Sequence, residues 1–209
     1  MEIGATGLIT STSHNHFLHM NVLLRHACGG SADSERDVET ILTEAALGKR
    51  RLWVTSILFA ELRPSTFRRG PFPTIAEFTN YIRAIATFVT PDPNTMLRAA
   101  RLRDVEWRRP AALRSPGERP RFMSLVDALQ IASALWVKEA LAVADLEFLA
   151  FDDHTSDDAE GGGRRLSLLR LQDYTDDLPV SSDVLAAVEL TRVEPVLQPR
   201  QIRQSMPAG

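Results

Sequence analysis

Short apolar runs alternate with amphipathic segments along most of the 209-residue chain. The apolar runs predict buried strands, and they cover residues 17–24, 52–54, 146–151 and 166–171. Apolar residues at helical spacing predict helices over residues 34–47, 57–62, 74–89, 95–107, 124–143 and 182–190. Strands that alternate with helices are typical of a parallel sheet covered on both faces. We therefore expect an α/β fold with three α/β/α layers around a central parallel sheet.

Prolines and glycines mark the connections between these elements. Residues 91–94 read Pro-Asp-Pro-Asn and separate two expected helices, and residues 109–120 hold three prolines and a glycine, which predicts a loop or arm. We divide the chain into an extension over residues 1–15, a domain over residues 16–172 and a tail over residues 173–209 with one short helix. No internal repeat is visible in the sequence.

Composition narrows the class of protein. Hydrophobic residues make up 44% of the chain and charged residues 24%, which suits a globular domain and argues against disorder. No apolar run approaches the roughly 18–20 residues that a membrane span needs, and the first residues lack the pattern of a secretory signal. The single cysteine, Cys28, fits a reducing compartment. We therefore expect a cytoplasmic protein that does not enter a membrane.

Charge is distributed unevenly along the chain. The net charge of −3 argues against a protein that binds nucleic acid through bulk charge. Between Arg98 and Arg121, however, eight arginines stand against three acidic residues, whereas residues 139–160 hold eight acidic residues and no lysine or arginine. This arrangement suits a protein that binds a polyanion, such as a nucleic acid, beside a cation site, with Arg108 and Arg109 as contacts to the polyanion. Two ordinary solvated surfaces would give the same counts.

Three carboxylates stand in apolar surroundings where the expected strands end or helices begin, namely Glu61, Asp127 and Asp152. Parallel sheets bind ligands at the carboxyl ends of their strands, and clustered carboxylates suit Mg²⁺ or Mn²⁺. Each residue also has a simpler explanation. Asp127 fits a helix capping box with Ser124, Asp152 and Asp153 fit a strand-end turn, and Glu61 fits a solvated helix face.

The order of these residues resembles the PIN domain, the nuclease fold of VapC-type toxins in bacterial toxin–antitoxin pairs. The resemblance covers about residues 17–171, and its most specific part is the stretch Asp127-Ala-Leu-x-Ile-Ala-x-Ala-Leu. It implies an endoribonuclease that hydrolyses RNA with Mg²⁺ or Mn²⁺. RNA, an antitoxin protein and a second copy of the chain are the partners we consider.

The resemblance also implies roles for individual residues. Glu61, Asp127 and Asp152 would be catalytic metal ligands, with His19 as a further ligand. Three polar residues would line the site: Asn21, Ser56 and Asp153.

The first strand departs from the family's pattern. The family carries Leu-Asp-Thr-Asn-Val-Leu-Leu, whereas residues 18–24 read Leu-His-Met-Asn-Val-Leu-Leu, so His19 replaces the first aspartate. No acidic residue lies between Glu2 and Asp33 to take its place. A neutral imidazole ligates manganese or zinc but suits magnesium poorly, and an imidazolium would itself supply positive charge. The sequence therefore leaves open a nuclease with an altered site, an impaired module that binds RNA or a partner protein, and an α/β protein unrelated to nucleases.

Two further histidines precede the expected first strand. His14, His16 and His19 have the spacing of a His-x-His-x-x-His metal site. On a regular strand, however, His14 and His16 share one face and His19 points to the other, so a shared site needs a bulge or loop. We therefore expect His14 and His16 to be exposed.

Overall fold

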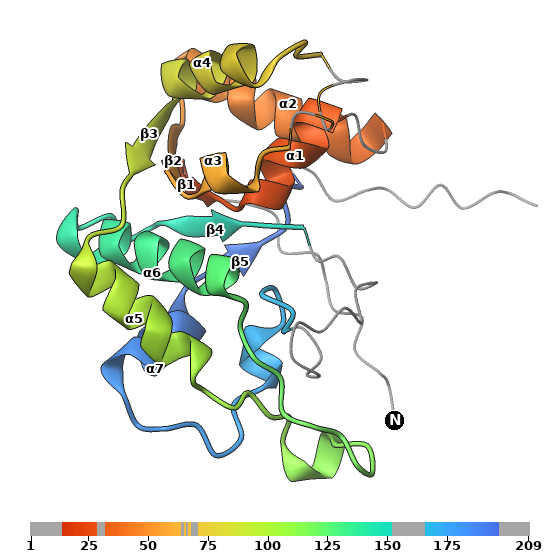
Figure 1. Cartoon of the computed structure of the whole chain (residues 1–209), viewed down its shortest axis with the longest axis vertical. Coiled ribbons are helices and arrows are strands. Elements are labelled where there is room, and N and C mark those ends of the chain that lie inside the picture. Colours follow the sequence, from red (N-terminus) through yellow and green to blue (C-terminus); the bar gives the residue numbers. More distant parts are fainter. Residues whose placement is uncertain are drawn as a thin grey trace, which may run out of the picture.

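The computed structural model describes residues 14–28, 32–63, 65, 67, 71–151 and 166–196. Within this part, five strands form one all-parallel sheet in the order β3-β2-β1-β4-β5 (Figure 1). The strands are β1 (Asn15–Leu18), β2 (Arg51–Thr55), β3 (Ala86–Val89), β4 (Glu147–Leu149) and β5 (Arg192–Val193). The α-helices are α1 (Met20–Cys28), α2 (Ala32–Ala46), α3 (Leu58–Glu61), α4 (Ile75–Ile85), α5 (Pro93–Arg103), α6 (Leu125–Ala140) and α7 (Ser182–Glu189).

Each face of the sheet carries its own hydrophobic core, because successive side chains of a strand point to opposite faces. Phe17 and Trp53 belong to the core that contains residues of α5, α6 and α7. Leu18 and Leu52 belong to the core that contains residues of α1, α2 and α4. In Figure 1, α1–α4 lie above the sheet and α5–α7 lie below it. The predicted α/β fold with a parallel sheet between helical layers is confirmed.

The first strand is shorter than the apolar run over residues 17–24, which we predicted to be a strand. β1 ends at Leu18, and α1 begins at Met20. Met20, Leu23 and Ala27 are buried at helical spacing against the upper core. The predicted boundary is wrong because a short apolar run does not distinguish a buried strand from a buried helix.

The helix predicted over residues 74–89 is divided into a helix and a strand. Thr74 caps α4, since its hydroxyl accepts the backbone N–H of Glu77 at 3.2 Å. The helix ends at Ile85, and β3 then pairs in parallel with β2. Thr87 and Phe88 are residue types that favour strands, and the pairing with β2 outweighs the helical spacing of the apolar residues.

Capping residues set the starts of α5 and α6. Asp92 accepts the backbone N–H of Thr95 at 2.7 Å, so α5 begins at Pro93, two residues before the predicted start. Ser124 accepts the backbone N–H of Asp127 at 3.1 Å, which confirms the predicted helix cap.

The end of the described chain adds an unpredicted strand. Residues 166–171, predicted to be a strand, instead form turns that lead into the 3-10 helix η3 (Leu171–Asp173). The fifth strand is β5, which pairs with β4. α7 packs on α5 and α6, so residues 173–196 contribute to the same core as the earlier residues. Among the described helices, none is long and apolar enough to cross a membrane.

Candidate functional site at the strand ends

The central strand β1 and its neighbour β4 meet at the reversal point of the sheet. The chain runs from β1 to β2 and β3 on one side, and then returns to place β4 on the other side of β1. Open parallel sheets bind ligands at the carboxyl ends of the strands beside such a reversal. His19 follows β1 at this edge, Phe151 lies just beyond β4, and Asp127 lies in the first turn of α6.

His19 and Asp127 form a buried pair at this edge. The distance from His19 Nε2 to Asp127 Oδ1 is 3.0 Å, and the two residues are 4% and 1% exposed. The backbone N–H of His19 donates to the carbonyl of Leu149 at 2.8 Å, and the imidazole meets the Phe148 ring edge-on. The pair therefore joins β1, β4 and α6.

Hydrogen bonds define the tautomer of His19. The backbone N–H of Asn21 donates to Nδ1 of His19 at 3.1 Å, and a ring nitrogen that accepts a hydrogen bond carries no proton. In a neutral ring the proton is then on Nε2, where it faces the carboxylate of Asp127. An imidazolium, or a metal bound at Nε2, would place a proton on Nδ1 against the N–H of Asn21. The geometry thus favours a neutral histidine that donates from Nε2 to Asp127.

Asn21 ties the start of α1 to the end of β4. Its Nδ2 donates to the carbonyl of Phe151 at 2.6 Å, and its Oδ1 accepts the N–H of Phe151 at 3.1 Å. One turn further along α1, the guanidinium of Arg25 lies 3.9 Å from the centroid of the Phe151 ring, within cation–π distance. Asn21 therefore lies at the strand ends, where it holds two elements together.

Gln130, which the sequence did not single out, connects Glu61 to this site. Its Oε1 accepts the backbone N–H of Met20 at 3.0 Å, and its Nε2 donates to Oε2 of Glu61 at 3.2 Å. Gln130 is buried and lies three residues after Asp127, on the same face of α6. That spacing is the signal that could have identified it. Glu61 itself is partly exposed at the end of α3.

The remaining residues predicted to belong to the site are Ser56, Asp152 and Asp153. The backbone N–H of Ser56 donates to the carbonyl of Val89 at 2.8 Å, so Ser56 joins the ends of β2 and β3. The N-cap residue of α3 is Ile57, and no side-chain hydrogen bond caps this helix. Asp152 and Asp153 lie outside the described residues.

Of the three carboxylates predicted to bind magnesium or manganese, Glu61 and Asp127 belong to the described residues and Asp152 does not. No group of three or more histidine, cysteine or acidic side chains among the described residues could hold a metal ion. Asp127 accepts the hydrogen bond of His19, and Glu61 accepts the hydrogen bond of Gln130. A neutral side chain therefore donates to each of these two carboxylates, which a metal centre would require to bind a cation.

His16 is buried and not exposed as we expected. Its Nε2 lies 2.7 Å from Nη1 of Arg50, and its Nδ1 lies 3.6 Å from Oε2 of Glu147. Arg50 also pairs with Glu44 of α2. The expectation failed because β1 is the central strand of the sheet, with helices on both faces. His16 and His19 lie at opposite ends of β1, so they do not share a metal site.

The predicted RNA contacts, Arg108 and Arg109, both pair with other residues of the chain. Arg108 donates to Glu106 at 2.5 Å. Arg109 donates to the hydroxyl of Tyr174 at 3.0 Å, and this hydrogen bond raises the pKa of Arg109. Five arginines between residues 98 and 121 contact an acidic side chain among the described residues: Arg98, Arg101, Arg108, Arg109 and Arg114. Much of the local arginine excess therefore holds this region together.

Comparisons with family models, with curated proteins and with solved structures find no match to the chain.

Proposed function

We propose that the chain is a PIN-like module that binds RNA without hydrolysing it. The sequence left two forms of the PIN-like hypothesis open, an altered nuclease and an impaired binding module. The hydrogen-bonded pair of neutral His19 and Asp127 is the observation that favours the second.

Phosphodiester hydrolysis requires an activated water, produced by a metal ion or by a general base. Both ring nitrogens of His19 are engaged in hydrogen bonds, so neither is available to accept a proton from water. Asp127 is 1% exposed and faces His19. Glu61 is partly exposed, but the amide of Gln130 holds its carboxylate. These contacts support a module that has lost the hydrolytic chemistry implied by the resemblance.

The choice of RNA as ligand rests on the resemblance to the PIN domain over about residues 17–171, together with exposed arginines elsewhere on the molecule. A partner protein, such as an antitoxin, is the alternative ligand class and becomes an outcome of the test. We place the module in the cytoplasm, since its single cysteine fits a reducing compartment.

The experiment measures binding and cleavage in the same reaction. The probe is a fluorescent single-stranded RNA of mixed sequence. Its length of about 20 nucleotides exceeds the number of nucleotides that a small domain usually covers. We expect anisotropy to report binding, and a denaturing gel to show intact RNA with Mg²⁺ and with Mn²⁺. Cleavage that Asp127→Asn abolishes would show that the module is an active nuclease. If the protein does not bind RNA, the proposed ligand is wrong, and a partner protein becomes the ligand class to test.

A further inference from the structure

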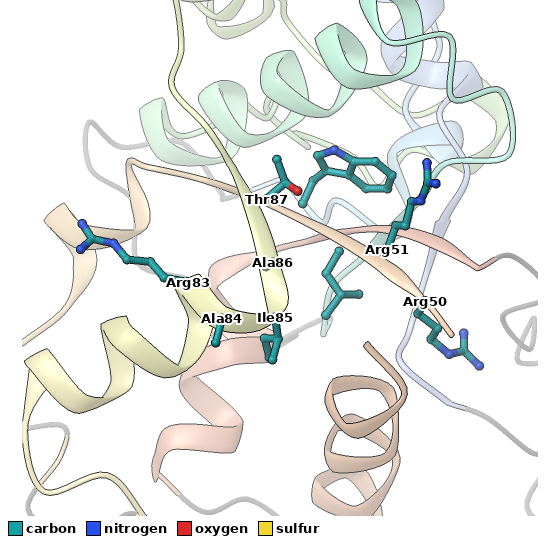
Figure 2. A pocket seen from close by; sticks show the side chains of 9 residues that line it. Arg50, Arg51, Arg83, Ala84, Ile85, Ala86 and Thr87 are labelled. Atoms are coloured by element: carbon teal, nitrogen blue, oxygen red, sulfur yellow. The ribbon is translucent and has the colours of Figure 1, made fainter. Parts of the chain in front are cut away.

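The amino ends of β2 and β3 border a hollow of about 490 Å³ (Figure 2). Its lining includes three arginines, Arg50, Arg51 and Arg83, and no acidic residue. In a parallel sheet all amino ends lie at one edge, so the hollow lies at the edge opposite His19 and Asp127. It is therefore separate from the strand-end site.

The side chains around the hollow have a defined arrangement. Arg51 and Trp53 point to the same face of β2 because they are two residues apart, and Thr87 is paired with Trp53 across the strands. Trp53 is buried, whereas Arg51 and Thr87 are exposed. Figure 2 shows Arg51 and Thr87 on one side of β3, while the side chain of Arg83 extends on the other side of this strand.

The positive charge of the hollow is only partly neutralised. Arg50 pairs with Glu44 and contacts His16. Arg51 and Arg83 are exposed, and among the described residues no carboxylate lies within ion-pair distance of either guanidinium. The guanidinium of Arg83 lies 5.7 Å from the centroid of the Phe59 ring, and Arg83 is exposed. These two arginines differ in this respect from Arg108 and Arg109, which pair with acidic side chains.

We propose that this hollow is the surface on which the module holds the phosphates of an RNA strand, an inference that rests on the proposed function. Guanidinium groups match phosphate oxygens in a two-pronged geometry. Because Arg51 and Arg83 point apart, they suit separate phosphates of an extended strand better than one phosphate group. RNA held here lies away from His19 and Asp127, in agreement with binding that does not lead to cleavage.

The test compares two double variants that remove the same charge. Arg51→Gln with Arg83→Gln removes the exposed pair, and Arg108→Gln with Arg109→Gln is the matched control. Binding of the same RNA is measured by anisotropy over a series of sodium chloride concentrations. We expect the first variant to bind about tenfold more weakly and to flatten the plot of log K against log salt by about 1.4, since each phosphate contact on a single strand contributes about 0.7. The control should change affinity by less than about twofold.

Each outcome separates this inference from the proposed function. If the wild type binds RNA and the first variant binds equally well, or if both variants lose affinity equally, the hollow is not the RNA surface. If the wild type binds inorganic polyphosphate through Arg51 and Arg83 but does not bind RNA, the hollow is a phosphate site and the proposed RNA function fails. If the wild type binds poly-glutamate more tightly than RNA and inorganic polyphosphate, the proposal that the hollow binds phosphates is wrong. Circular dichroism checks that each variant is folded. If the double variant unfolds, the binding measurement is repeated with Arg51→Gln alone, because Arg51 is exposed at the start of β2.

Discussion

The backbone N–H of Asn21 donates a hydrogen bond to Nδ1 of His19 over 3.1 Å. This contact places the ring proton on Nε2, where it faces Oδ1 of Asp127 at 3.0 Å. A histidine in this position could have served as a metal ligand, as an imidazolium or as a neutral donor. The contact from Asn21 favours the neutral donor, and this tautomer underlies the proposal that the module does not cleave RNA.

Replacing His19 should create a metal site. We expect His19→Asp to lower the thermal midpoint without metal, because two carboxylates would then meet in a buried position. Mg²⁺ or Mn²⁺ should then stabilise the variant, by about 2.7 kcal/mol when free metal exceeds the Kd about 100-fold. The wild type should respond little to either metal. Thermal unfolding with and without metal measures both effects.

His19→Gln is the control for this prediction, since its amide can still donate to Asp127 but adds no charge. It should show no stabilisation by metal. Equal stabilisation of the wild type and His19→Asp by Mg²⁺ would contradict the claim that His19 excludes a cation.

Removing the Asn21 side chain should weaken the junction between the start of α1 and the end of β4. Asn21→Ala leaves the backbone N–H and carbonyl of Phe151 without their side-chain partners. We expect a loss of about 1–3 kcal/mol in the free energy of unfolding, measured by urea denaturation. Asn94→Ala, at an exposed position in the first turn of α5, is the control and should change stability much less. Similar losses in both variants would show that the Asn21 contacts do not stabilise the fold.

His26 should make the protein less stable as the pH falls. Its ring lies 5.7 Å from Phe72 and 5.9 Å from Tyr81, and no described residue donates to or accepts from its buried Nδ1. Burial lowers the pKa of His26 below 6.5, against the opposing effect of Glu39 and Glu35. The unfolded chain therefore takes up the proton at a higher pH than the folded chain. Stability should fall as the pH drops through 6.5 toward the lower folded-state pKa.

His26→Phe tests this pH dependence, because a phenyl ring keeps the aromatic contacts and carries no titrating group. Urea denaturation at neutral and mildly acidic pH should show a smaller acid-induced loss of stability in the variant than in the wild type. His14→Gln is the matched control at an exposed histidine. An unchanged pH profile in His26→Phe would assign the acid sensitivity to other groups.

Asp183 should stabilise the packing of α7 against α5. Its two oxygens accept hydrogen bonds from Arg98 at 2.7 Å and Arg101 at 2.6 Å. Burial raises the pKa of Asp183, but the two arginines outweigh this effect and hold the pKa below its usual value. We expect Asp183→Asn to cost about 2–4 kcal/mol at neutral pH.

The contribution of Asp183 has a definite pH dependence. It is present above the unfolded-state pKa of about 3.9 and is lost as the pH falls through the lower folded-state value. Glu106→Gln, which removes the exposed pair with Arg108, should cost less than about 1 kcal/mol. Urea denaturation at neutral pH compares the two variants, and equal losses would contradict the importance of the Asp183 contacts.

Local patterns in the sequence were sufficient for the fold class and for most helices. The cap of α6 depends on Ser124 and Asp127, which are three residues apart, so the sequence alone identifies it. The alternation of strands and helices likewise indicated a parallel sheet. Both features depend on residues close together in the chain, where spacing and chemistry are directly visible.

Tertiary structure decided the features that join distant residues. Asp127 is 108 residues from His19, and Tyr174 is 65 residues from Arg109, so no local pattern predicted either contact. In the structure, the expected metal ligand His19 contacts Asp127, and the expected RNA contact Arg109 donates to Tyr174. The burial of His16 and the strand character of Ala86–Val89 depend in the same way on the neighbouring strands. The physical reason is that burial and pairing are properties of packed surfaces, which form only when separate elements come together.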